Sequence, residues 1–310
     1  MTAQGSGRRV ATVDIGTNTL LLLVVEVGEG GELTRIADEC RFGRLGRGVD
    51  ARGQLDPDAV ARSLEIVREY AAIARAAGAG QIAAVGTQAL REAGNARDFL
   101  EPAAAALGAP VEVISGEREA KLVCRAVDAS MPEMARGDLV VADVGGGSTE
   151  VIVARGGEVI SFSSLPIGAV RLTERHLRSD PSAADEAKAM IADIDDTLAD
   201  LELPKGAPLV GTSGTATTLV SVETHMRAYD PDAIHGQAID AGEVDRQLAS
   251  FLELKVAERR HLPGMQPERA DVIVAGVAIY ARLLNRLGAR AMVVSDRGVR
   301  WGLAYELAAT

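Results

Sequence analysis

Two short stretches of this sequence place an acidic residue, a glycine turn and a cluster of hydroxyl side chains directly after an apolar run. They are DIGTNT at residues 14–19 and DVGGGSTE at residues 143–150. Glycine lets the backbone approach a phosphate group closely, and consecutive turn amides form a concave donor site for anionic oxygens. We therefore expect both stretches to bind phosphate. The expected contacts are Thr17, Asn18, Thr19, Gly145, Gly146, Gly147, Ser148 and Thr149.

A third turn of similar composition, GTSGT at residues 211–215, also follows an apolar run. Short glycine motifs often match by chance, so each turn taken alone is explained about equally well by a tight hairpin. Three such turns in one chain favour phosphate binding. The third would contribute Gly211, Ser213, Gly214 and Thr215.

An aspartate opens each of the first two loops. A carboxylate beside a phosphate loop would repel the phosphate, unless a divalent cation lies between them, bound through oxygen or through water. Asp14 and Asp143 are therefore candidate ligands of Mg²⁺, with Mn²⁺ as the alternative ion. A simpler explanation is that each aspartate only caps its turn.

Alternating strands and helices surround the first loop. Apolar runs at residues 10–13 and 20–27 predict strands, and the GEGG turn after them leads into a third strand at 32–38. From Asp56, a typical N-cap, apolar residues recur at helical spacing as far as Gly78. Further strands are expected at 81–85 and 111–114, and further helices at 96–107 and 117–131.

The second half of the chain opens in the same way as the first. VDIGTNTLLLLVVEVGEGGEL aligns with ADVGGGSTEVIVARGGEVI, and the two aspartates are 143 − 14 = 129 residues apart. A β-hairpin with an acidic glycine turn is thus used twice. The remaining strands are expected at 138–142, 151–154, 158–165, 209–210 and 291–294, and the remaining helices at about 169–177, 182–201, 216–225, 268–287 and from 299 onward.

The composition bounds the class of the molecule. A chain of 310 residues with 47% hydrophobic residues is long enough for two domains of ordinary size. Because aromatic residues make up only 3%, the core must consist mainly of Ala, Val, Leu and Ile, as in helices packed on a parallel or mixed sheet. A barrel or a sandwich is less favoured.

The net charge of -11 argues against a nucleic-acid partner, because an acidic surface repels a phosphate backbone. Any polyanionic substrate must therefore meet a local basic site. The longest apolar run, residues 20–25, is far shorter than a membrane span, and Asp14 interrupts the apolar stretch that a signal peptide needs. We expect a cytoplasmic protein with no membrane partner.

Six stretches of the sequence carry a family resemblance. They are DIGTNT, VGTQALREAGNARDFL, VISGEREAKL, VADVGGGSTEVIV, GTSGT and VVSDRGVRWGLAYE, in that order. Together they resemble the short form of the exopolyphosphatase and guanosine pentaphosphatase (Ppx/GppA) family, within the actin, sugar kinase and Hsp70 superfamily. The resemblance implies an α/β fold of two ribonuclease-H-like (actin-like) lobes, with mixed sheets flanked by helices around a central cleft. The first lobe would be residues 1–130 plus about 299–310, and the second 131–298.

The resemblance implies a metal-dependent phosphoanhydride hydrolase that releases terminal phosphate from inorganic polyphosphate. Guanosine pentaphosphate is the alternative substrate. A non-catalytic sensor that binds polyphosphate or nucleotide, or an ATP-dependent switch or kinase of the same superfamily, stays open. The sequence sets neither the preferred chain length nor the oligomeric state, for which a homodimer is a candidate.

The resemblance also implies roles for individual residues. In SGEREA, the glutamate before the alanine, Glu119, matches the family's catalytic glutamate, and Asp143 matches a metal and phosphate residue. Glu150 is the runner-up as general base and otherwise a metal ligand. The position of Glu119 in the first turn of a helix is also explained by the helix dipole alone.

Arginines could neutralise the substrate. Arg91 matches a family arginine that faces bound phosphates, although a solvated arginine on a helix surface is a serious rival explanation. The glycine-rich stretch CRFGRLGRGVDARG at residues 40–53 carries four more arginines. We expect it to form a mobile basic loop that guides a polyanion or keeps a long connection in solution.

Overall fold

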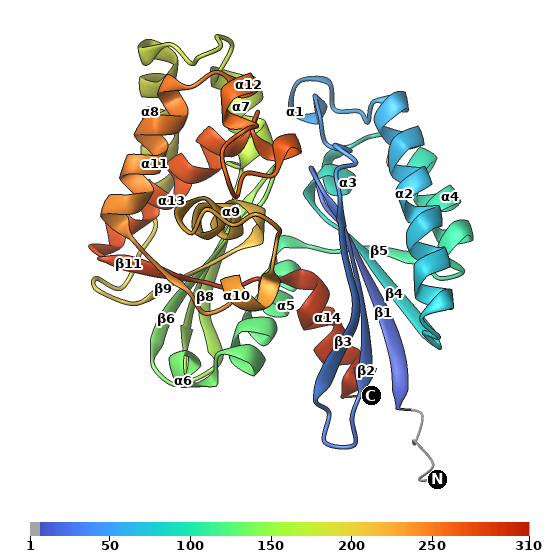
Figure 1. The fold of residues 1–310 in the computed structure, drawn as a ribbon. Helices are drawn as coiled ribbons and strands as arrows, with labels where there is room; N and C mark the ends of the chain where they lie inside the picture. Colours follow the sequence, from blue (N-terminus) through green and yellow to red (C-terminus); the bar gives the residue numbers. More distant parts are fainter. Residues whose placement is uncertain (1–6, 310) are drawn as a thin grey trace. The chain divides into compact units, whose positions relative to one another are not determined.

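The structure, a computed structural model, describes residues 7–309. The chain divides into two compact units, one made of the residues up to Ala126 together with the segment from Val299 onward, and the other of Val127–Gly298. Each unit contains a mixed β-sheet flanked by helices (Figure 1). The predicted α/β class with two mixed sheets is confirmed.

The sheet of the first unit has the strand order β3-β2-β1-β4-β5. Its strands are β1 (Arg8–Ile15), β2 (Leu20–Val27), β3 (Leu33–Arg41), β4 (Gln81–Gly86) and β5 (Val111–Val113). Because a short loop joins β1 to β2 whereas a helical crossover precedes β4, β1 pairs antiparallel with β2 and parallel with β4. The end of β1, which carries Asp14, therefore lies in the middle of the sheet.

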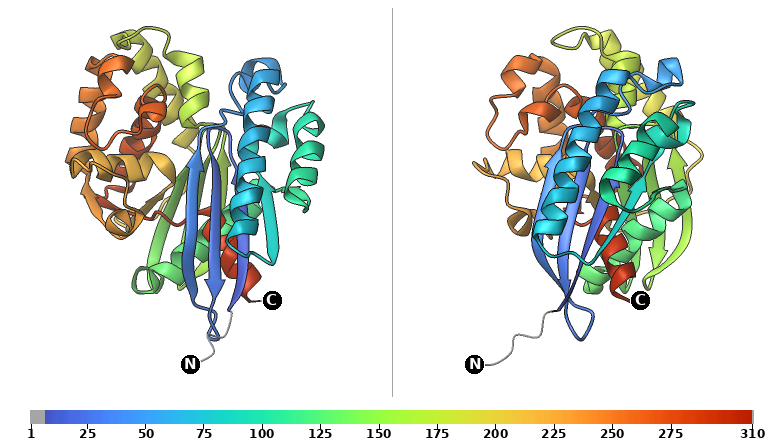
Figure 2. Two further views of the ribbon diagram at one scale, coloured as in Figure 1. Left: turned by 45° about the vertical axis from the view of Figure 1, so that its right-hand side comes forward. Right: turned by 90° about the vertical axis from the view of Figure 1, so that its right-hand side faces the viewer.

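Helices lie on both faces of this sheet (Figure 2). They are α1 (Val49–Arg52), α2 (Pro57–Ala76), α3 (Gln88–Glu92), α4 (Arg97–Leu107), α5 (Gly116–Ser130) and α14 (Val299–Ala308). Alternate residues of β1 divide between the two faces, because side chains of a strand alternate. Ala11 and Val13 join the core beneath α2 and α4, whereas Val10 packs with Trp301 of α14.

The sheet of the second unit has the strand order β10-β11-β9-β6-β7-β8. Its strands are β6 (Asp138–Val144), β7 (Thr149–Arg155), β8 (Glu158–Leu165), β9 (Leu209–Thr212), β10 (Ala238–Asp240) and β11 (Ala291–Val294). As in the first unit, an antiparallel run of three strands, β6-β7-β8, is followed by parallel strands, β9 and β11, on the other side of the first strand. The predicted duplication of the hairpin therefore extends to five strands of each sheet, and β10 is an additional antiparallel edge strand of the second.

The second unit carries most of the remaining helices. They are α6 (Pro132–Ala135), α7 (Ala169–His176), α8 (Ala184–Leu198), α9 (Ser213–Glu223), α10 (Pro231–Ile234), α11 (Ala241–Glu253), α12 (Val256–Arg259), the 3₁₀ helix η1 (Pro267–Arg269) and α13 (Ile273–Leu287). Nearly every residue of α13 is buried in the core that α7, α8, α9 and α11 share with the sheet. Within residues 7–309, no helix combines the length and the apolarity needed to cross a bilayer.

Several elements differ from those that the sequence predicts. The sequence predicts no element in residues 226–267, which contain α10, β10, α11 and α12. In α11, Val244, Leu248 and Phe251 stand at helical spacing and are buried. The helix expected from residue 216 begins at Ser213, and the helix expected from 268 begins at Ile273, after η1. The GTSGT stretch is therefore the end of β9 followed directly by the start of α9, not a free loop.

Candidate functional site

The loop between β6 and β7 closes tightly on itself. The amide of Gly145 donates to the carbonyl of Ser148 at 3.0 Å, and the strand resumes at Thr149, whose hydroxyl donates to the carbonyl of Ile167 at 2.7 Å. A Cβ atom on Gly145 would lie 3.1 Å from the carbonyl oxygen of Ser148, so glycine suits the turn. The structure thus brings the expected phosphate contacts at 145–149 together at the end of the central strand β6.

Helix α7 lies directly behind this loop; the sequence predicts the helix at about 169–177 but not its contact with the loop. The amides of Ala169, Val170 and Arg171 donate to the first two carbonyls of residues 145–147, at 2.8–3.0 Å. The side chain of Arg171 donates through Nε to the third carbonyl at 2.8 Å. Donors from the first turn of α7 therefore hold all three glycine carbonyls of the loop.

Gly168 permits this close approach of helix and loop. A Cβ atom at residue 168 would lie 2.6 Å from the carbonyl oxygen of Gly146 and 2.7 Å from the amide nitrogen of Gly147. Because both neighbours are backbone atoms, no side-chain rotation could relieve the overlap. The glycine is visible in the sequence just before a predicted helix, but nothing in its spacing connects it to the earlier loop.

Two carboxylates lie side by side at this end of the sheet. Asp143 and Glu150 are register partners in β6 and β7, so their side chains point to the same face. Both are buried, with 7% and 1% of their surface exposed. Glu150 accepts hydrogen bonds from the hydroxyls of Ser148 at 2.9 Å and Ser164 at 2.8 Å, and Asp143 accepts one from the hydroxyl of Ser213.

This pair of carboxylates fits a hard divalent cation. Burial raises the pKa of Asp143 above its ordinary value, and the hydrogen bond from Ser213 partly offsets that effect, so the ionised form would gain from a nearby cation. Within the part of the chain that the structure describes, no three acidic, His or Cys side chains converge as a complete ligand set. Mg²⁺ usually keeps several waters and takes substrate phosphates as ligands, so one or two carboxylates such as Asp143 and Glu150 suffice.

The start of α9 lies beside Asp143. Ser213, the residue that holds Asp143, has a φ of 69°, a left-handed conformation that is uncommon for a residue with a side chain. A Cβ atom on the next residue, Gly214, would overlap the guanidinium of Arg269. Arg269 is 9% exposed and was not identified from the sequence, which gives no sign that η1 returns to this turn. It places a buried positive charge against the third predicted phosphate turn.

Two of the expected phosphate contacts, Gly211 and Thr215, make packing contacts in the core. A Cβ atom on Gly211 would lie 2.9 Å from Sδ of Met292 and 3.0 Å from the ring of Tyr280. Thr215 is 2% exposed and packs against Gly276 of α13. The packing of α13 therefore accounts for a glycine at 211 and a threonine at 215. By contrast, Ser213 lies beside Asp143, and Gly214 lies beside Arg269.

The loop between β1 and β2 repeats the turn of the second unit. The amide of Gly16 donates to the carbonyl of Thr19 at 3.0 Å, the same distance as in the other loop. Asp14 stands one residue before the end of β1, which is the place that Asp143 holds in β6. The two hairpins share both the position of the acid and the form of the turn.

The segment at residues 43–47 lies behind this first loop. The amides of Arg44 and Gly46 donate to the carbonyls of Asn18 at 2.9 Å and Thr17 at 2.8 Å. Arg44 has a φ of 53°, in the left-handed region. The expectation of a mobile basic loop is wrong for this part of it, because backbone hydrogen bonds fix it against residues 17 and 18.

The predicted base and the predicted phosphate arginine form an ion pair in the first unit. Glu119 lies in the first turn of α5, and Arg91 ends α3. Nη1 of Arg91 lies 2.8 Å from Oε2 of Glu119 and also donates to the carbonyl of Ile114 at 2.8 Å. With 22% and 10% of their side chains exposed, these residues are not solvated surface groups. Arg91 thus orients the carboxylate of Glu119.

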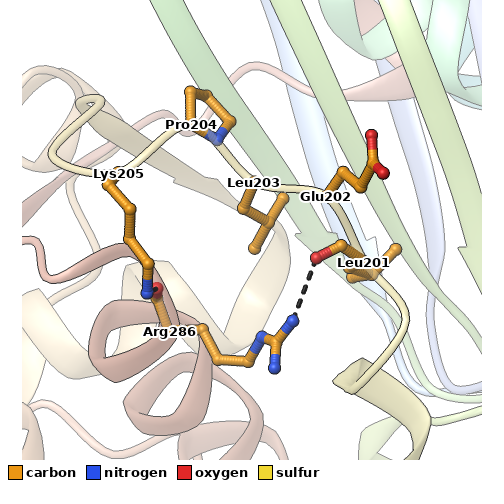
Figure 3. A pocket seen from close by; sticks show the side chains of 6 residues that line it. All are labelled: Leu201, Glu202, Leu203, Pro204, Lys205 and Arg286. Carbon is orange, nitrogen blue, oxygen red and sulfur yellow. Dashed lines mark hydrogen bonds between the residues drawn. The ribbon is translucent and has the colours of Figure 1, made fainter.

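A cavity of about 460 Å³ lies elsewhere in the second unit (Figure 3). It is lined by Leu201, Glu202, Leu203, Pro204, Lys205 and Arg286. Residues 201–205 lie between α8 and β9, and Arg286 lies in the last turn of α13. Lys205 and Arg286 donate to backbone carbonyls, as in the 2.9 Å bond from Arg286 to Leu201. The cavity contains no predicted site residue and is separate from the candidate site.

Known proteins resemble this chain over nearly its whole length. A family model described as the Ppx/GppA phosphatase family matches residues 23–310. The chain is 36% identical over 316 aligned positions to exopolyphosphatase 2 of Mycobacterium tuberculosis, which covers 97% of this chain and 98% of that protein. It is also 29% identical to a bifunctional 3-dehydroquinate synthase/phosphatase of Fusobacterium nucleatum, over 96% of this chain and 46% of that protein.

Solved structures give the same picture. The Aquifex aeolicus member of the Ppx/GppA protein family superposes with a TM-score of 0.82 at 32% identity and covers 97% of both chains. An exopolyphosphatase from Cytophaga hutchinsonii superposes with a TM-score of 0.88 at 25% identity, over 97% of this chain and 98% of that one.

Proposed function

We propose that this chain, which belongs to the Ppx/GppA phosphatase family, is an exopolyphosphatase that releases terminal phosphate from inorganic polyphosphate. The observation that carries the proposal is the duplicated turn. In each copy an aspartate stands one residue before the end of a strand, and the loop that follows is fixed by backbone hydrogen bonds in a form that suits anion binding. The name of the relative from Mycobacterium tuberculosis favours polyphosphate over other phosphoanhydrides.

Each group of residues has a part in this proposal. The amides of residues 146–148 and the polar side chains of residues 17–19 bind phosphate oxygens. Arg269 and Arg91 supply positive charge beside them. Glu119, oriented by Arg91, takes a proton from the attacking water at its carboxylate. Mg²⁺, or Mn²⁺ in its place, would screen the charge that builds up on the phosphate oxygens.

The environment of Glu150 favours a metal-binding role over the role of base. Two hydroxyls donate to its Oε1 atom, from Ser148 and Ser164. Hydrogen bonds to a carboxylate stabilise its charged form, which is the form that binds a cation, and Asp143 stands opposite Glu150 on the neighbouring strand as a second carboxylate. We therefore assign Glu150 to the cation together with Asp143. Two statements stay predictions from the sequence: that Asp14 is a third acid at the cation, and that Asp14 and Asp143 face one cleft.

A direct substrate comparison tests the proposal. Phosphate release from short polyphosphate, long polyphosphate, guanosine pentaphosphate and ATP should be measured side by side with Mg²⁺. We expect polyphosphate to be the best substrate. Faster release from guanosine pentaphosphate would establish the alternative substrate, and release from ATP alone would favour a nucleotide-dependent switch. If no substrate releases phosphate although polyphosphate binds, the protein is a sensor.

The cation site has its own test. Asp143→Asn keeps the size of the side chain but removes a full charge, so the variant should need more Mg²⁺ for half-maximal activity. The measurement is a Mg²⁺ titration of activity, together with calorimetric binding of Mn²⁺ to the protein without substrate. Unchanged titrations would remove Asp143 from the site.

We also propose that the protein is cytoplasmic. As a separate proposal, it forms a homodimer through the edge strand β8. Residues 159–165 of this strand carry no charge, and Ile160 and Phe162 are 56% and 39% exposed. An uncharged edge strand can pair with its own copy in the antiparallel sense. The corresponding edge strand β3 of the first unit is protected by four charged residues, Arg35, Asp38, Glu39 and Arg41. If this is the interface, Ile160→Lys should convert a dimer into a monomer in light scattering, and a monomeric wild type would reject it.

A further inference from the structure

The contacts between α7 and the loop at 145–147 determine where the amides of that loop point. A trans peptide unit is planar, so its C=O and N–H groups point in opposite directions. The carbonyls of residues 145, 146 and 147 all point toward donors of α7. The amides of Gly146, Gly147 and Ser148 belong to the same three peptide units and therefore point away from α7.

Three successive amides that point to one side form a cradle for an anionic oxygen. In the first two peptide units the carbonyls are held by backbone amides of α7, at 2.8–3.0 Å. In the third unit, between Gly147 and Ser148, the carbonyl is held by a side chain, Nε of Arg171, at 2.8 Å. The direction of the Ser148 amide thus depends on the identity of a single residue.

We propose that Arg171 is a positioning residue, which keeps the Ser148 amide directed at a bound phosphate by holding the carbonyl of Gly147. This inference rests on the proposed function of the loop as a phosphate site. Gly147 has no Cβ, so the peptide unit after it can rotate at little steric cost once the contact is lost. Rotation would replace an N–H donor by a carbonyl oxygen, which repels phosphate.

The location of Arg171 agrees with this role. Its residue surface is 8% exposed, and its own amide donates to Gly146 at 3.0 Å, so the same residue holds two neighbouring peptide units. A different explanation is that the charge of Arg171 contacts the substrate directly. The two explanations differ in which atom of the side chain matters, and this difference can be tested.

A crossed pair of substitutions separates them. In glutamine, Nε2 stands at the same position along the side chain as Nε of arginine, so Arg171→Gln keeps the donor and removes the charge. In lysine a methylene stands at that position, so Arg171→Lys keeps the charge and removes the donor. A positioning role predicts that the glutamine variant binds phosphate better than the lysine variant. A direct charge contact predicts the reverse order.

The measurement is a titration of the magnesium-loaded protein with inorganic phosphate, followed by the amide resonances of residues 146–148 and by calorimetry. We expect Arg171→Lys to weaken binding roughly 5- to 10-fold, the value of one lost hydrogen bond, and Arg171→Gln to stay within about 3-fold of wild type. The Ser148 amide should respond to phosphate in the wild type and in Arg171→Gln, but not in Arg171→Lys. The matched controls are Arg175→Gln and Arg175→Lys, one turn further along α7, where the arginine pairs with Asp193 at 2.9 Å.

Several outcomes would overturn the inference. The inference is wrong if Arg171→Lys binds phosphate better than Arg171→Gln, or if both variants bind it as well as the wild type. It is also wrong if both variants unfold, or if the amides of residues 146–148 in the wild type do not respond to phosphate. Failure of this inference can also be distinguished from failure of the proposed function. A wild type that binds phosphate at these amides but releases none from polyphosphate would reject the hydrolysis and leave the positioning role in place.

Discussion

The two hairpin loops share their turn and differ in what lies behind it. In both, an aspartate stands one residue before the strand end, and a glycine amide closes the turn at 3.0 Å. Behind the first loop is the turn at residues 43–47, whose amides hold two carbonyls. Behind the second is helix α7, whose first turn holds three. The duplicated fold has thus kept the turn while its support has changed.

This difference suggests a division of labour between the units. A helix N-terminus adds positive potential behind the second loop, which favours a bound anion. The first loop offers polar side chains instead, and the hydroxyl of Thr17 donates its proton to Oε1 of Gln88 at 3.2 Å. The ion pair of Arg91 and Glu119 belongs to the first unit. We therefore expect the second unit to dominate phosphate and cation binding, and the first to activate water.

The largest expected effect tests that division directly. Glu119→Gln should lower kcat on the order of 10²-fold or more, because the variant cannot take a proton from water. Polyphosphate affinity should hold or improve, since a negative charge beside a polyanion is lost. The measurement pairs kcat for phosphate release with an equilibrium binding assay.

The matched variant in the second unit is Glu150→Gln. It should change the Mg²⁺ dependence more than the maximal rate, because we assign Glu150 to the cation. If kcat is retained in Glu119→Gln and lost in Glu150→Gln at saturating Mg²⁺, the base lies in the second unit and the division is reversed.

A second pair of substitutions compares the supports of the two loops. Gly168→Ala would drive a Cβ atom into the backbone of residues 146 and 147, so the loop or α7 must move. We expect kcat/KM to fall roughly 10²-fold, because a displacement of about 1 Å can cost that much. Gly46→Ala in the first unit would meet side-chain atoms and no backbone atom, namely Cγ2 of Thr17 at 2.3 Å and Cβ of Ala89 at 3.0 Å. Its effect should be several-fold smaller, and equal effects would contradict the comparison.

These supports also show where prediction from sequence ends. The turns and the aspartates were predictable because local residue types encode them, and so was the order of strands and helices around them. The approach of Gly168 to Gly146 and of Arg269 to Gly214 was not, because it depends on how distant segments pack. Arg91 was identified by resemblance, but its 2.8 Å contact with Glu119 could be known only from the structure.

A third pair concerns two buried tyrosines that hold carbonyls beside the loops. Tyr280 in the second unit lies 2.6 Å from the carbonyl of Thr212 and 3.1 Å from that of Ala142, which precede Ser213 and Asp143. Tyr70 in the first unit donates to a single carbonyl, that of the first residue of β2, at 2.8 Å. Burial raises the pKa of both phenols, so both stay protonated and able to donate.

Tyr280→Phe should therefore cost more than Tyr70→Phe. We expect losses of about 1–2 kcal/mol and about 1 kcal/mol in the free energy of unfolding, because each substitution leaves a buried carbonyl without its donor. Activity should fall a few-fold in Tyr280→Phe and less in Tyr70→Phe. Urea unfolding and steady-state kinetics of both variants provide the measurement, and a larger loss of activity in Tyr70→Phe would place the more sensitive loop in the first unit.

The smallest expected effect concerns the way in which the first unit is completed by the last helix. Arg118 of α5 binds Glu306 of α14, with a 2.7 Å bond from Nη1 to Oε2, and this hydrogen bond lowers the pKa of Glu306. A lowered folded pKa gives stability that is present above the unfolded pKa and lost as the pH falls through the folded value. Because 31% and 35% of the two side chains are exposed, solvent screening limits the effect to ~1 kcal/mol or less. Glu306→Gln should thus lower the free energy of unfolding at pH 7 and leave it equal to that of the wild type in acid, below the folded pKa. Urea unfolding at each pH provides the measurement.

The control is Glu117→Gln, which removes an exposed pair with Lys121 on the same α5 helix and should change the stability little. A loss for Glu306→Gln that is the same at both pH values would show that shape, not charge, holds α14 in place.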